Sequence, residues 1–405
     1  MKKLLISTLI SLYTLTAHAG QELATYQEVL KLMNQHYFDS NYNNLDWPKL
    51  TAKARERIKT AKSSIDKYQA ITDLLKTLGH SHLKFHPPAI KASKGPRIPT
   101  GTPKEINFQI EQIGNQWVIT SVKEKSDAWQ AGLRTGFIVK KLNQWSTKTL
   151  FNDKKAMAFY YMQMTLENYP KTKITLSGIN EQGRKSKVTW KLSRFKGTVE
   201  RLGNLSKRTE VVSKILPGNI GYVSFNIYLI GSAQQTIKAI KKFRNLDCPG
   251  IIIDLRNNPG GVATMSCAIA KEFCQKNYTL GTQTGRESVL TFPVYAQPKA
   301  YKGKVVLLLN RYSASTSEVM AAGIQANKGA IVIGEVSAGM ALPSVIVNFD
   351  DGSVLQYPVA DFKTVNGKDV EGIGVTPDIK ISHTLDALKK GKDLFLEEAI
   401  RILRQ

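Results

Sequence analysis

Three serines, Ser313, Ser315 and Ser317, occupy alternate positions in the stretch NRYSASTSEVMAAG, which follows an apolar run and leads into small residues of helical character. A strand that breaks into a helix can present a serine hydroxyl as a nucleophile. Such a hydroxyl needs a base to take its proton, a group that orients the base, and backbone N–H groups for the developing oxyanion. Candidates for all three partners occur elsewhere in the chain.

The base could come from the segment GHSHLKFH, which places His80, His82 and His86 directly after an amphipathic helical segment. An unperturbed imidazole has a pKa of about 6.5, so it is mostly neutral at pH 7 and can accept a proton. We therefore expect a histidine base to ionise at about pH 6 to 7. A metal site is the alternative, but the triplet lacks the carboxylate or cysteine ligands of the known zinc spacings. No metal or cofactor is expected, and surface histidines without a function remain the ordinary explanation.

The other two partners have candidates in glycine-rich segments. Gly260 and Gly261 end the segment DLRNNPGG after a predicted strand, where the absence of side chains lets backbone N–H groups approach a ligand. A tight strand-to-helix turn would explain the same glycines. Glu371 lies in the segment KDVEGIGVTPD, and loop carboxylates are usually only solvated. None of these signals identifies an activity by itself.

The composition is that of a globular, strongly basic protein. The chain of 405 residues has 57 Lys and Arg against 32 Asp and Glu, a formal net charge of +25. This length allows two or three domains. A positive charge of this size favours polyanionic partners, but the chain has no recognised nucleic-acid-binding motif, so we expect an anionic envelope surface or acidic polypeptides instead.

The three cysteines show neither zinc nor CxxC spacing. Cys267 and Cys274 are two turns apart on a predicted helix, about 10 Å by helical rise, which is too far for a disulfide. They are expected to be buried small apolar residues. A disulfide that involves Cys248 stays open.

Residues 1–19 have the three parts of a secretory signal peptide: Lys2 and Lys3, an apolar run, and a small-x-small site at Ala17 to Ala19. We expect cleavage after Ala19 and export to the periplasm or the medium. No later stretch approaches the ~20 apolar residues of a membrane span.

The remaining chain divides into three predicted domains. Residues 20–95 show helical periodicity and form a helical cap, which runs into a linker rich in Pro, Gly and Lys. Residues 98–200 contain short alternating runs typical of a small β-rich domain. Residues 205–405 alternate strands with helices, which predicts an α/β core with sites at the carboxyl ends of its strands. Both DLRNNPGG and NRYSAS lie at such ends.

In their order and contexts, these motifs resemble the C-terminal processing peptidase family, which comprises the tail-specific proteases and their tricorn-core-like relatives. The resemblance covers nearly the whole chain after the leader. It implies a ClpP/crotonase-like α/β core with a helical cap and a PDZ-like domain, and a serine endopeptidase that acts through an acyl-enzyme without a cofactor. The segments that carry it are NYNNLDWPKL, LLKTLGHSHLKF, GIIIDLRNNPGG, LLLNRYSASTSEVMAAGIQ, GAIVIGE and DVEGIGVTPDI.

The resemblance also implies roles for particular residues. In the family the middle serine of S-x-S-x-S is the nucleophile, here Ser315. The oxyanion donors would be the N–H of Thr316 together with Gly260 or Gly261. Tail-specific enzymes use a lysine as base and a glutamine four residues later; these positions hold Met340 and Ser344 here.

The tricorn-like branch uses a different base, and its pattern is present. It has a histidine preceded by a serine after the cap, and a glutamate near the end of the chain. Ser81, His82 and Glu371 match these positions, which implies a relay from Ser315 to His82, with Ser81 bonded to the imidazole and Glu371 bonded to Ser81. The rival function is a catalytically inactive family member that binds peptides or hydrophobic ligands, because the lysine is absent.

The PDZ-like assignment depends on the stretch AWQAGLRTGFIVKKLNQ. Phe137 replaces the aspartate that is usual in this motif, and Gly132 and Gly136 would also fit ordinary turns. Capture of a peptide end by β-augmentation at this domain therefore stays open. The matching residues are Ala131, Gly132, Leu133, Gly136, Ile138 and Asn143.

Overall fold

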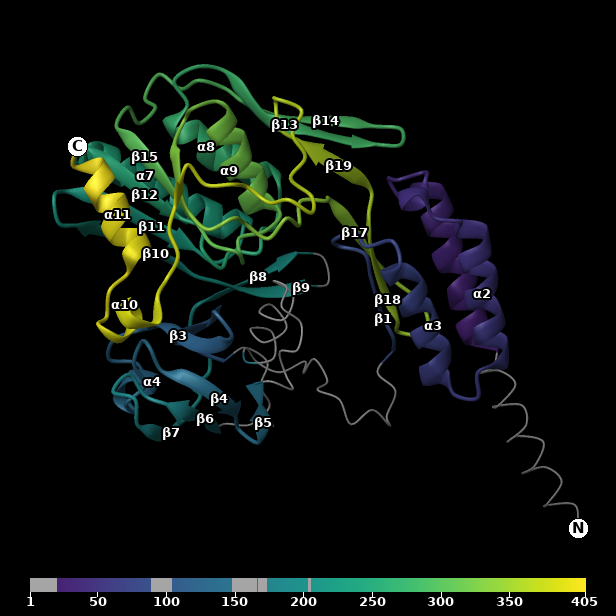
Figure 1. Cartoon of the computed structure of the whole chain (residues 1–405). Helices are drawn as coiled ribbons and strands as arrows, with labels where there is room; N and C mark the ends of the chain where they lie inside the picture. The colour runs from purple at the N-terminus through teal and green to yellow at the C-terminus, as the bar shows by residue number, and fades with distance from the viewer. Residues whose placement is uncertain (1–19, 89–103, 148–165, 167–172, 203–204) are drawn as a thin grey trace, which may run out of the picture.

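A six-stranded sheet organises the second half of the chain in the computed structural model, which describes residues 20–88, 104–147, 166, 173–202 and 205–405 (Figure 1). Strands β11, β12, β15, β16 and β20 pair in parallel, and β10 pairs antiparallel with β11 at one edge. The strands are β10 (Val211–Leu216), β11 (Ile220–Phe225), β12 (Gly250–Asp254), β15 (Lys304–Leu309), β16 (Ile331–Gly334) and β20 (Ile379–Lys380). The predicted signal peptide, its cleavage site and most of the predicted linker lie outside the described residues.

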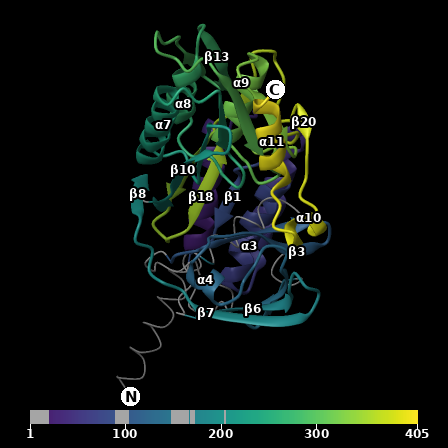
Figure 2. The ribbon, with the colours of Figure 1, turned by 90° about the vertical axis from the view of Figure 1, so that its left-hand side faces the viewer.

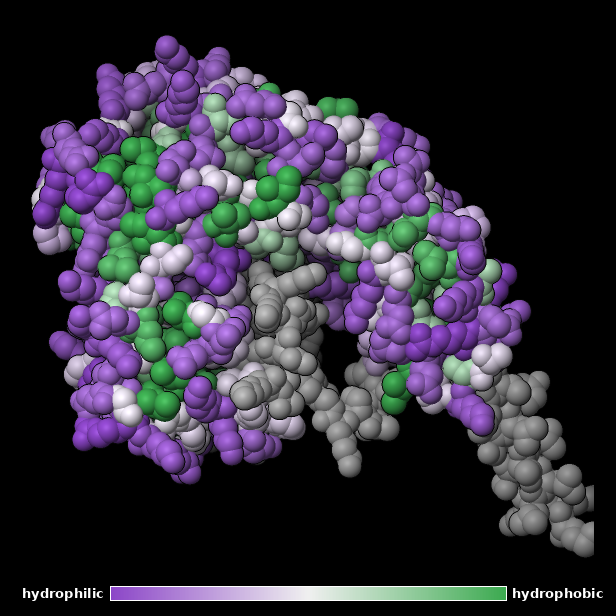
Figure 3. All heavy atoms as spheres, in the orientation of Figure 1, coloured by the Kyte–Doolittle hydropathy of each residue, from purple (hydrophilic) through white to green (hydrophobic). Residues whose placement is uncertain are grey.

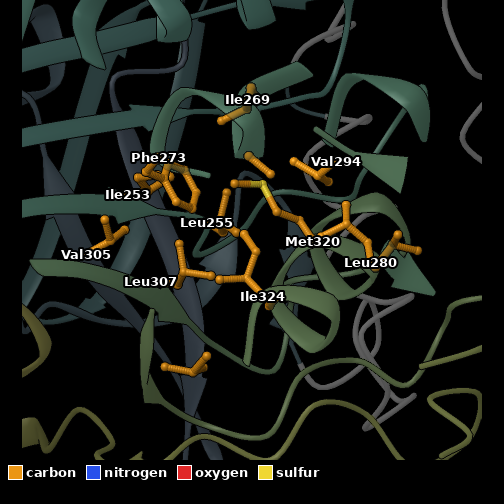
Figure 4. Packing of buried hydrophobic residues seen from close by; sticks show 14 of the residues in the cluster. Ile253, Leu255, Ile269, Phe273, Leu280, Val294, Val305, Leu307, Met320 and Ile324 are labelled. Atoms are coloured by element: carbon orange, nitrogen blue, oxygen red, sulfur yellow. The ribbon is translucent and has the colours of Figure 1, made fainter. Parts of the chain in front are cut away.

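Helices cover both faces of this sheet, which explains why its central strands are continuous apolar runs. Ile253 and Leu307 point into a buried cluster with Met320 of α9 (Figure 4), whereas Ile252 and Leu308, one residue away, pack against α11 on the other face. The helices are α7 (Ile230–Asn245), α8 (Thr264–Ala270), the 3₁₀ helix η2 (Lys271–Phe273), α9 (Thr316–Ala326) and α11 (Leu394–Leu403).

A helical cap lies at one side of this core (Figure 1). It holds a helix over residues 20–36, the 3₁₀ helix η1 (Tyr42–Asn44), α2 (Trp47–Thr60) and α3 (Ser64–Lys76), followed by strand β1 (Lys84–His86). β1 joins β18 (Val354–Pro358) and β17 (Ser344–Asn348) in a three-stranded sheet.

The tip of the β17–β18 hairpin is fixed to the cap. Asp351 accepts hydrogen bonds from the hydroxyls of Thr25, at 2.6 Å, and Tyr68, at 2.7 Å. Phe349 and Leu355 belong to the same buried cluster as the apolar face of the cap helices. The hairpin therefore fixes the cap, and the histidine segment that follows it, relative to the core.

Another antiparallel sheet, called the second sheet below, precedes the core in the chain. Its strands run in the order β2-β3-β4-β6-β7, with β5 beside β4. Burial alternates along β6 and β7, as expected where one face packs on a core and the other is solvated, whereas β3 buries the three consecutive residues 117–119. The elements are β2 (Phe108–Ile113), β3 (Gln116–Val122), α4 (Asp127–Gln130), β4 (Ile138–Leu142), β5 (Trp145–Ser146), β6 (Lys173–Ile179) and β7 (Lys185–Lys191).

The remaining elements connect these parts. Two-stranded β8 (Thr198–Leu202) and β9 (Leu205–Thr209) lead into the core, β13 (Tyr278–Gly285), β14 (Val289–Val294) and β19 (Ala360–Lys363) form a three-stranded sheet, and α10 (Leu385–Lys389) precedes α11. Leu388 of α10 packs against Val118 and Ile138 of the second sheet.

All three cysteines are free in the structure. Cys248 and Cys274 are buried, as expected, and Cys267 is partly buried. The pairing left open for Cys248 is therefore absent. Among the described residues, no helix combines the length and apolar character needed to cross a membrane.

Candidate active site

Ser315 lies at the turn between β15 and α9, at the carboxyl edge of the sheet. Its backbone has φ +55° and ψ −118°, a left-handed conformation that a residue with a side chain rarely adopts. On such a sharp strand-to-helix turn, the serine side chain projects away from both the preceding strand and the following helix. The turn therefore presents the Ser315 hydroxyl outside the first turn of α9.

The neighbouring serines are engaged in structural hydrogen bonds. Ser313 is fully buried and donates to the carbonyl of Leu255 at 2.8 Å, and Ser317 is fully buried and donates to the carbonyl of Asn258 at 3.0 Å. Ser315 is partly exposed. Of the three serines singled out in the sequence, it alone is not fully buried, which makes it the candidate nucleophile.

The glycine segment after β12 lies against this serine because β12 and β15 are neighbours in the sheet. A Cβ on Gly260 would stand 2.7 Å from both the Ser315 Cβ and the Thr316 nitrogen, so only glycine fits there. The Gly260 N–H donates to the Asn258 side chain at 2.9 Å. Within the described residues, the N–H groups of Gly261 and Thr316 have no protein acceptor, which leaves these two as the candidate oxyanion donors.

Asn258 and Tyr228 hold the glycine segment in place. The Asn258 side chain is fully buried and donates to the carbonyl of Phe225 at 2.8 Å, while the backbone carbonyl of Asn258 accepts from the Ala314 N–H at 3.0 Å. The Tyr228 N–H donates to the carbonyl of Gly260 at 2.8 Å. Neither residue stands out in the sequence, because only tertiary contacts distinguish them.

Ser81, His82 and Glu371 form one hydrogen-bonded group. Glu371 Oε2 accepts from the Ser81 hydroxyl at 2.8 Å, and Glu371 Oε1 accepts from the Ser81 N–H at 2.8 Å. Ser81 Oγ lies 2.9 Å from His82 Nδ1. The structure thus joins residues that are 290 positions apart in the chain.

This arrangement determines which imidazole nitrogen carries the proton. An ionised carboxylate can only accept, so the single proton of the Ser81 hydroxyl points to Glu371. The bond between Ser81 Oγ and His82 must then be donated by the Nδ1–H of His82. In the neutral imidazole, Nε2 is therefore the unprotonated nitrogen that can accept a proton.

A two-residue bridge connects this group with Ser315. The Met340 carbonyl accepts from the Ser315 N–H at 3.0 Å, and the N–H of the next residue, Ala341, donates to Glu371 Oε2 at 2.9 Å. Within the described residues no direct hydrogen bond links Ser315 and His82. The nucleophile candidate and the histidine group are thus neighbours across one peptide unit.

Burial shifts the ionisation of the histidine segment. Desolvation lowers the pKa of His82 to about 4, and the nearby Lys84 ammonium adds to this effect. Desolvation also lowers the pKa of Lys84 to about 8. His82 is therefore neutral over a wider pH range than the sequence-based expectation of about pH 6 to 7 allows.

The other two histidines of the segment point elsewhere. His80 Nδ1 is hydrogen-bonded to the Tyr37 hydroxyl, and His86 lies on β1 opposite Val354. Within the part of the chain that the structure describes, no three side chains of metal-ligand type are gathered. The triplet in the sequence thus does not converge on one point.

Comparison with known proteins assigns the chain to a family. Residues 219–381 match the model of peptidase family S41. A carboxyl-terminal-processing protease of Synechocystis is 25% identical over 363 residues, which cover 88% of this chain and 80% of that protein. Residues 219–381 belong to peptidase family S41, and the chain as a whole is similar to the C-terminal processing peptidases. It is a serine-type peptidase.

Solved structures share the fold of this peptidase. The photosystem II D1 C-terminal processing protease superposes with a TM-score of 0.60 at 20% identity, over 95% of this chain and 97% of that one. The tricorn protease superposes with a TM-score of 0.52 at 18% identity, over 96% of this chain but only 37% of that one.

The two positions where tail-specific enzymes carry lysine and glutamine have different surroundings in this peptidase. Met340 contributes its carbonyl to Ser315, as described above. Ser344 begins β17, and its hydroxyl accepts from the Gln356 side chain at 2.8 Å.

The fully buried Glu318, in the first turn of α9, also supports the nucleophile turn. Its Oε2 accepts from the N–H groups of Ser315, at 2.9 Å, and Met340, at 2.8 Å. Its Oε1 accepts from the Gly339 N–H at 2.7 Å and the Ser337 hydroxyl at 2.5 Å. Burial raises the pKa of Glu318 to about 7. In the sequence it looks like an ordinary first-turn acid, so nothing there indicated this role.

Glu318→Gln is expected to destabilise the peptidase by about 1–3 kcal/mol, measured by urea unfolding. In the variant, the side-chain NH₂ of glutamine replaces one carboxylate oxygen of Glu318. The two donors that this oxygen accepts from would then have no acceptor. Glu287→Gln, at an exposed position, is the matched control and should be nearly neutral. Equal stability of the two variants would show that the Glu318 contacts do not support the turn.

Proposed function

We propose that the chain is an exported serine endopeptidase that hydrolyses polypeptides through an acyl-enzyme, with Ser315 as nucleophile and His82 as base. The observation that carries the proposal is the continuous set of contacts from Glu371 through Ser81 to His82, joined to Ser315 by the Met340–Ala341 peptide. The tautomer of His82 supports it further, because Nε2 is free to accept the serine proton.

The proposed reaction follows from these positions. Ser315 Oγ attacks the scissile carbonyl while its proton passes to His82 Nε2. The oxyanion receives hydrogen bonds from the N–H groups of Gly261 and Thr316. His82 then gives its proton to the leaving amine, the C–N bond breaks, and an ester to Ser315 remains. A water molecule, deprotonated by His82, attacks the ester; the bond to Ser315 Oγ breaks, and His82 returns the proton to that oxygen.

Ser81 and Glu371 would orient the imidazole and stabilise it when it is charged. The imidazolium keeps its Nδ1–H bond to Ser81, whose hydroxyl donates a hydrogen bond to the Glu371 carboxylate. The negative charge therefore acts on the ring through one hydroxyl. No lysine base is needed in this scheme, and Met340 serves through its backbone.

The second sheet is proposed as the PDZ-like domain that captures a peptide end by β-augmentation. Leu133 and Phe137 are buried in its core, and both motif glycines, Gly132 and Gly136, have positive φ, at +95° and +80°.

The name of the Synechocystis relative suggests carboxyl-terminal segments as substrates. Residues 1–19 support export, with cleavage after Ala19.

The pH dependence of hydrolysis tests the assigned base. Because kcat/KM reports groups of the free enzyme, it should fall only as His82 becomes protonated, near pH 4 rather than 6.5, and stay level between about pH 6 and 8.

The lowered pKa of His82 also means that the unfolded chain binds this proton more tightly than the folded chain does. Stability from the neutral His82 is complete above about pH 6.5 and is lost as the pH falls towards 4. Fluorescence at each pH identifies the range in which the enzyme stays folded.

A lysine base would give a different profile. Lys84 has a pKa of about 8. If kcat/KM rises through pH 8 in the native enzyme but not in Lys84→Met, the base is Lys84 and the proposal is wrong. No hydrolysis at any pH, with peptide binding retained, would favour the alternative of an inactive binding protein.

A further inference from the structure

The outer face of the second sheet carries five lysines, Lys141, Lys173, Lys185, Lys187 and Lys191, which we call the lysine face. All five are exposed. The residues between them on β6 and β7 point the other way into a buried cluster that includes Leu176, Val188 and Trp190. The alternation along the strands therefore places the lysines on one side and the domain core on the other.

The strand register brings these charges together. Lys173 stands directly opposite Lys191, and Ser177 of β6 stands between Lys141 of β4 and Lys187 of β7. Like charges directly opposite each other destabilise a sheet, so folding does not explain this arrangement. Within the described part of the chain, none of the five lysines takes part in an ion pair.

Apart from Ile179, which stands opposite Lys185 and packs against the cluster with Leu388 of α10, the remaining side chains of this face fit an anionic partner. Between the lysines lie the hydroxyls of Thr175, Ser177 and Thr189, which can donate to phosphate oxygens. The face has no acidic and no aromatic side chain on the paired positions of β6 and β7. A partner with negative charge and no need for stacking is therefore indicated.

The dimensions favour a surface over a chain-like partner. From Lys185 to Lys191 the face is about 20 Å long, and three strands make it about 10 Å wide. An extended peptide that pairs with a strand edge, such as that of β7, would lie beside the sheet and not over the face on which the lysine side chains stand. Single-stranded nucleic acid would need stacking platforms, which this face lacks.

We propose that the lysine face binds the phosphate surface of an anionic lipid bilayer. β6 and β7 lie along one end of the molecule, apart from α8 and α9 (Figure 2), and mainly hydrophilic side chains cover the same rim (Figure 3). Ser315 is the N-cap residue of α9, so docking through the β6–β7 end of the molecule leaves the catalytic turn uncovered. This inference does not depend on the proposed reaction.

Co-sedimentation of the full chain with vesicles tests the proposal. Binding is expected to vesicles of phosphatidylcholine mixed with phosphatidylglycerol, but not to phosphatidylcholine alone, and should weaken at high salt. Each lysine near such a surface contributes about a fivefold change in partitioning. The combined variant Lys173→Gln, Lys187→Gln and Lys191→Gln should therefore bind on the order of 100-fold more weakly.

The matched control removes the same charge elsewhere. Lys238, Lys276 and Lys302 are exposed on the α/β core, and their combined change to Gln should alter vesicle binding by less than about threefold. Both variants should hydrolyse a soluble peptide like the native enzyme. Equal losses in the two variants would reduce the effect to net charge and overturn the proposal. So would native protein that ignores anionic vesicles but binds polyglutamate, which would assign the face to acidic polypeptides.

Discussion

Ser315→Ala is expected to lower kcat for polypeptide hydrolysis by about 10⁴- to 10⁶-fold while the protein stays folded. The change removes the attacking oxygen and leaves only the oxyanion donors and substrate binding to assist water. The Ser315 side chain forms a capping box with Glu318 at the start of α9, so its loss should cost only about 1 kcal/mol of stability and leave the fold intact. Steady-state kinetics and the thermal midpoint measure the two effects.

Ser313→Ala and Ser317→Ala are the controls for this result. Both serines are buried and donate to backbone carbonyls, so each change should lower the free energy of unfolding by about 1 kcal/mol and retain most of the activity. Loss of hydrolysis in Ser317→Ala, with Ser315→Ala still active, would place the nucleophile two residues later and contradict the assignment.

His82→Ala is expected to reduce kcat about as much as Ser315→Ala, because the two residues act as one unit in the proton transfer. The double variant should then be no slower than either single variant. Ser81→Ala should reduce kcat less, since it removes the group that orients the ring but leaves the proton acceptor. Full additivity in the double variant would mean that His82 acts independently of Ser315.

Much of the core could be predicted from the sequence because its pattern is local. The strand predicted ahead of the DLRNNPGG segment is β12, and the apolar run ahead of NRYSAS forms β15. Neighbouring parallel strands place their carboxyl ends together, which brings the segments around Gly260 and Ser315 into contact. The family and the serine-type peptidase activity implied by the resemblance are confirmed by the comparisons.

The parts that could not be predicted depend on contacts between distant segments. The role of Glu318 requires residues 337–340 to fold back over α9, and no pattern near Glu318 indicates this. The low pKa of His82 depends on its burial next to Lys84, which the spacing of histidines does not reveal. Gly260 could be separated from Gly261 as an oxyanion donor only once the Asn258 side chain was seen to accept its N–H.

The central claim is that Ser315 is an activated nucleophile whose proton goes to His82, and covalent labelling tests it most directly. The native enzyme and His82→Ala are treated with a fluorophosphonate probe, and the modified residue is identified by peptide mass spectrometry. Modification of Ser315 is expected in the native enzyme, and little or none in His82→Ala. Labelling of another serine, or equal labelling of Ser315 in both proteins, would contradict it.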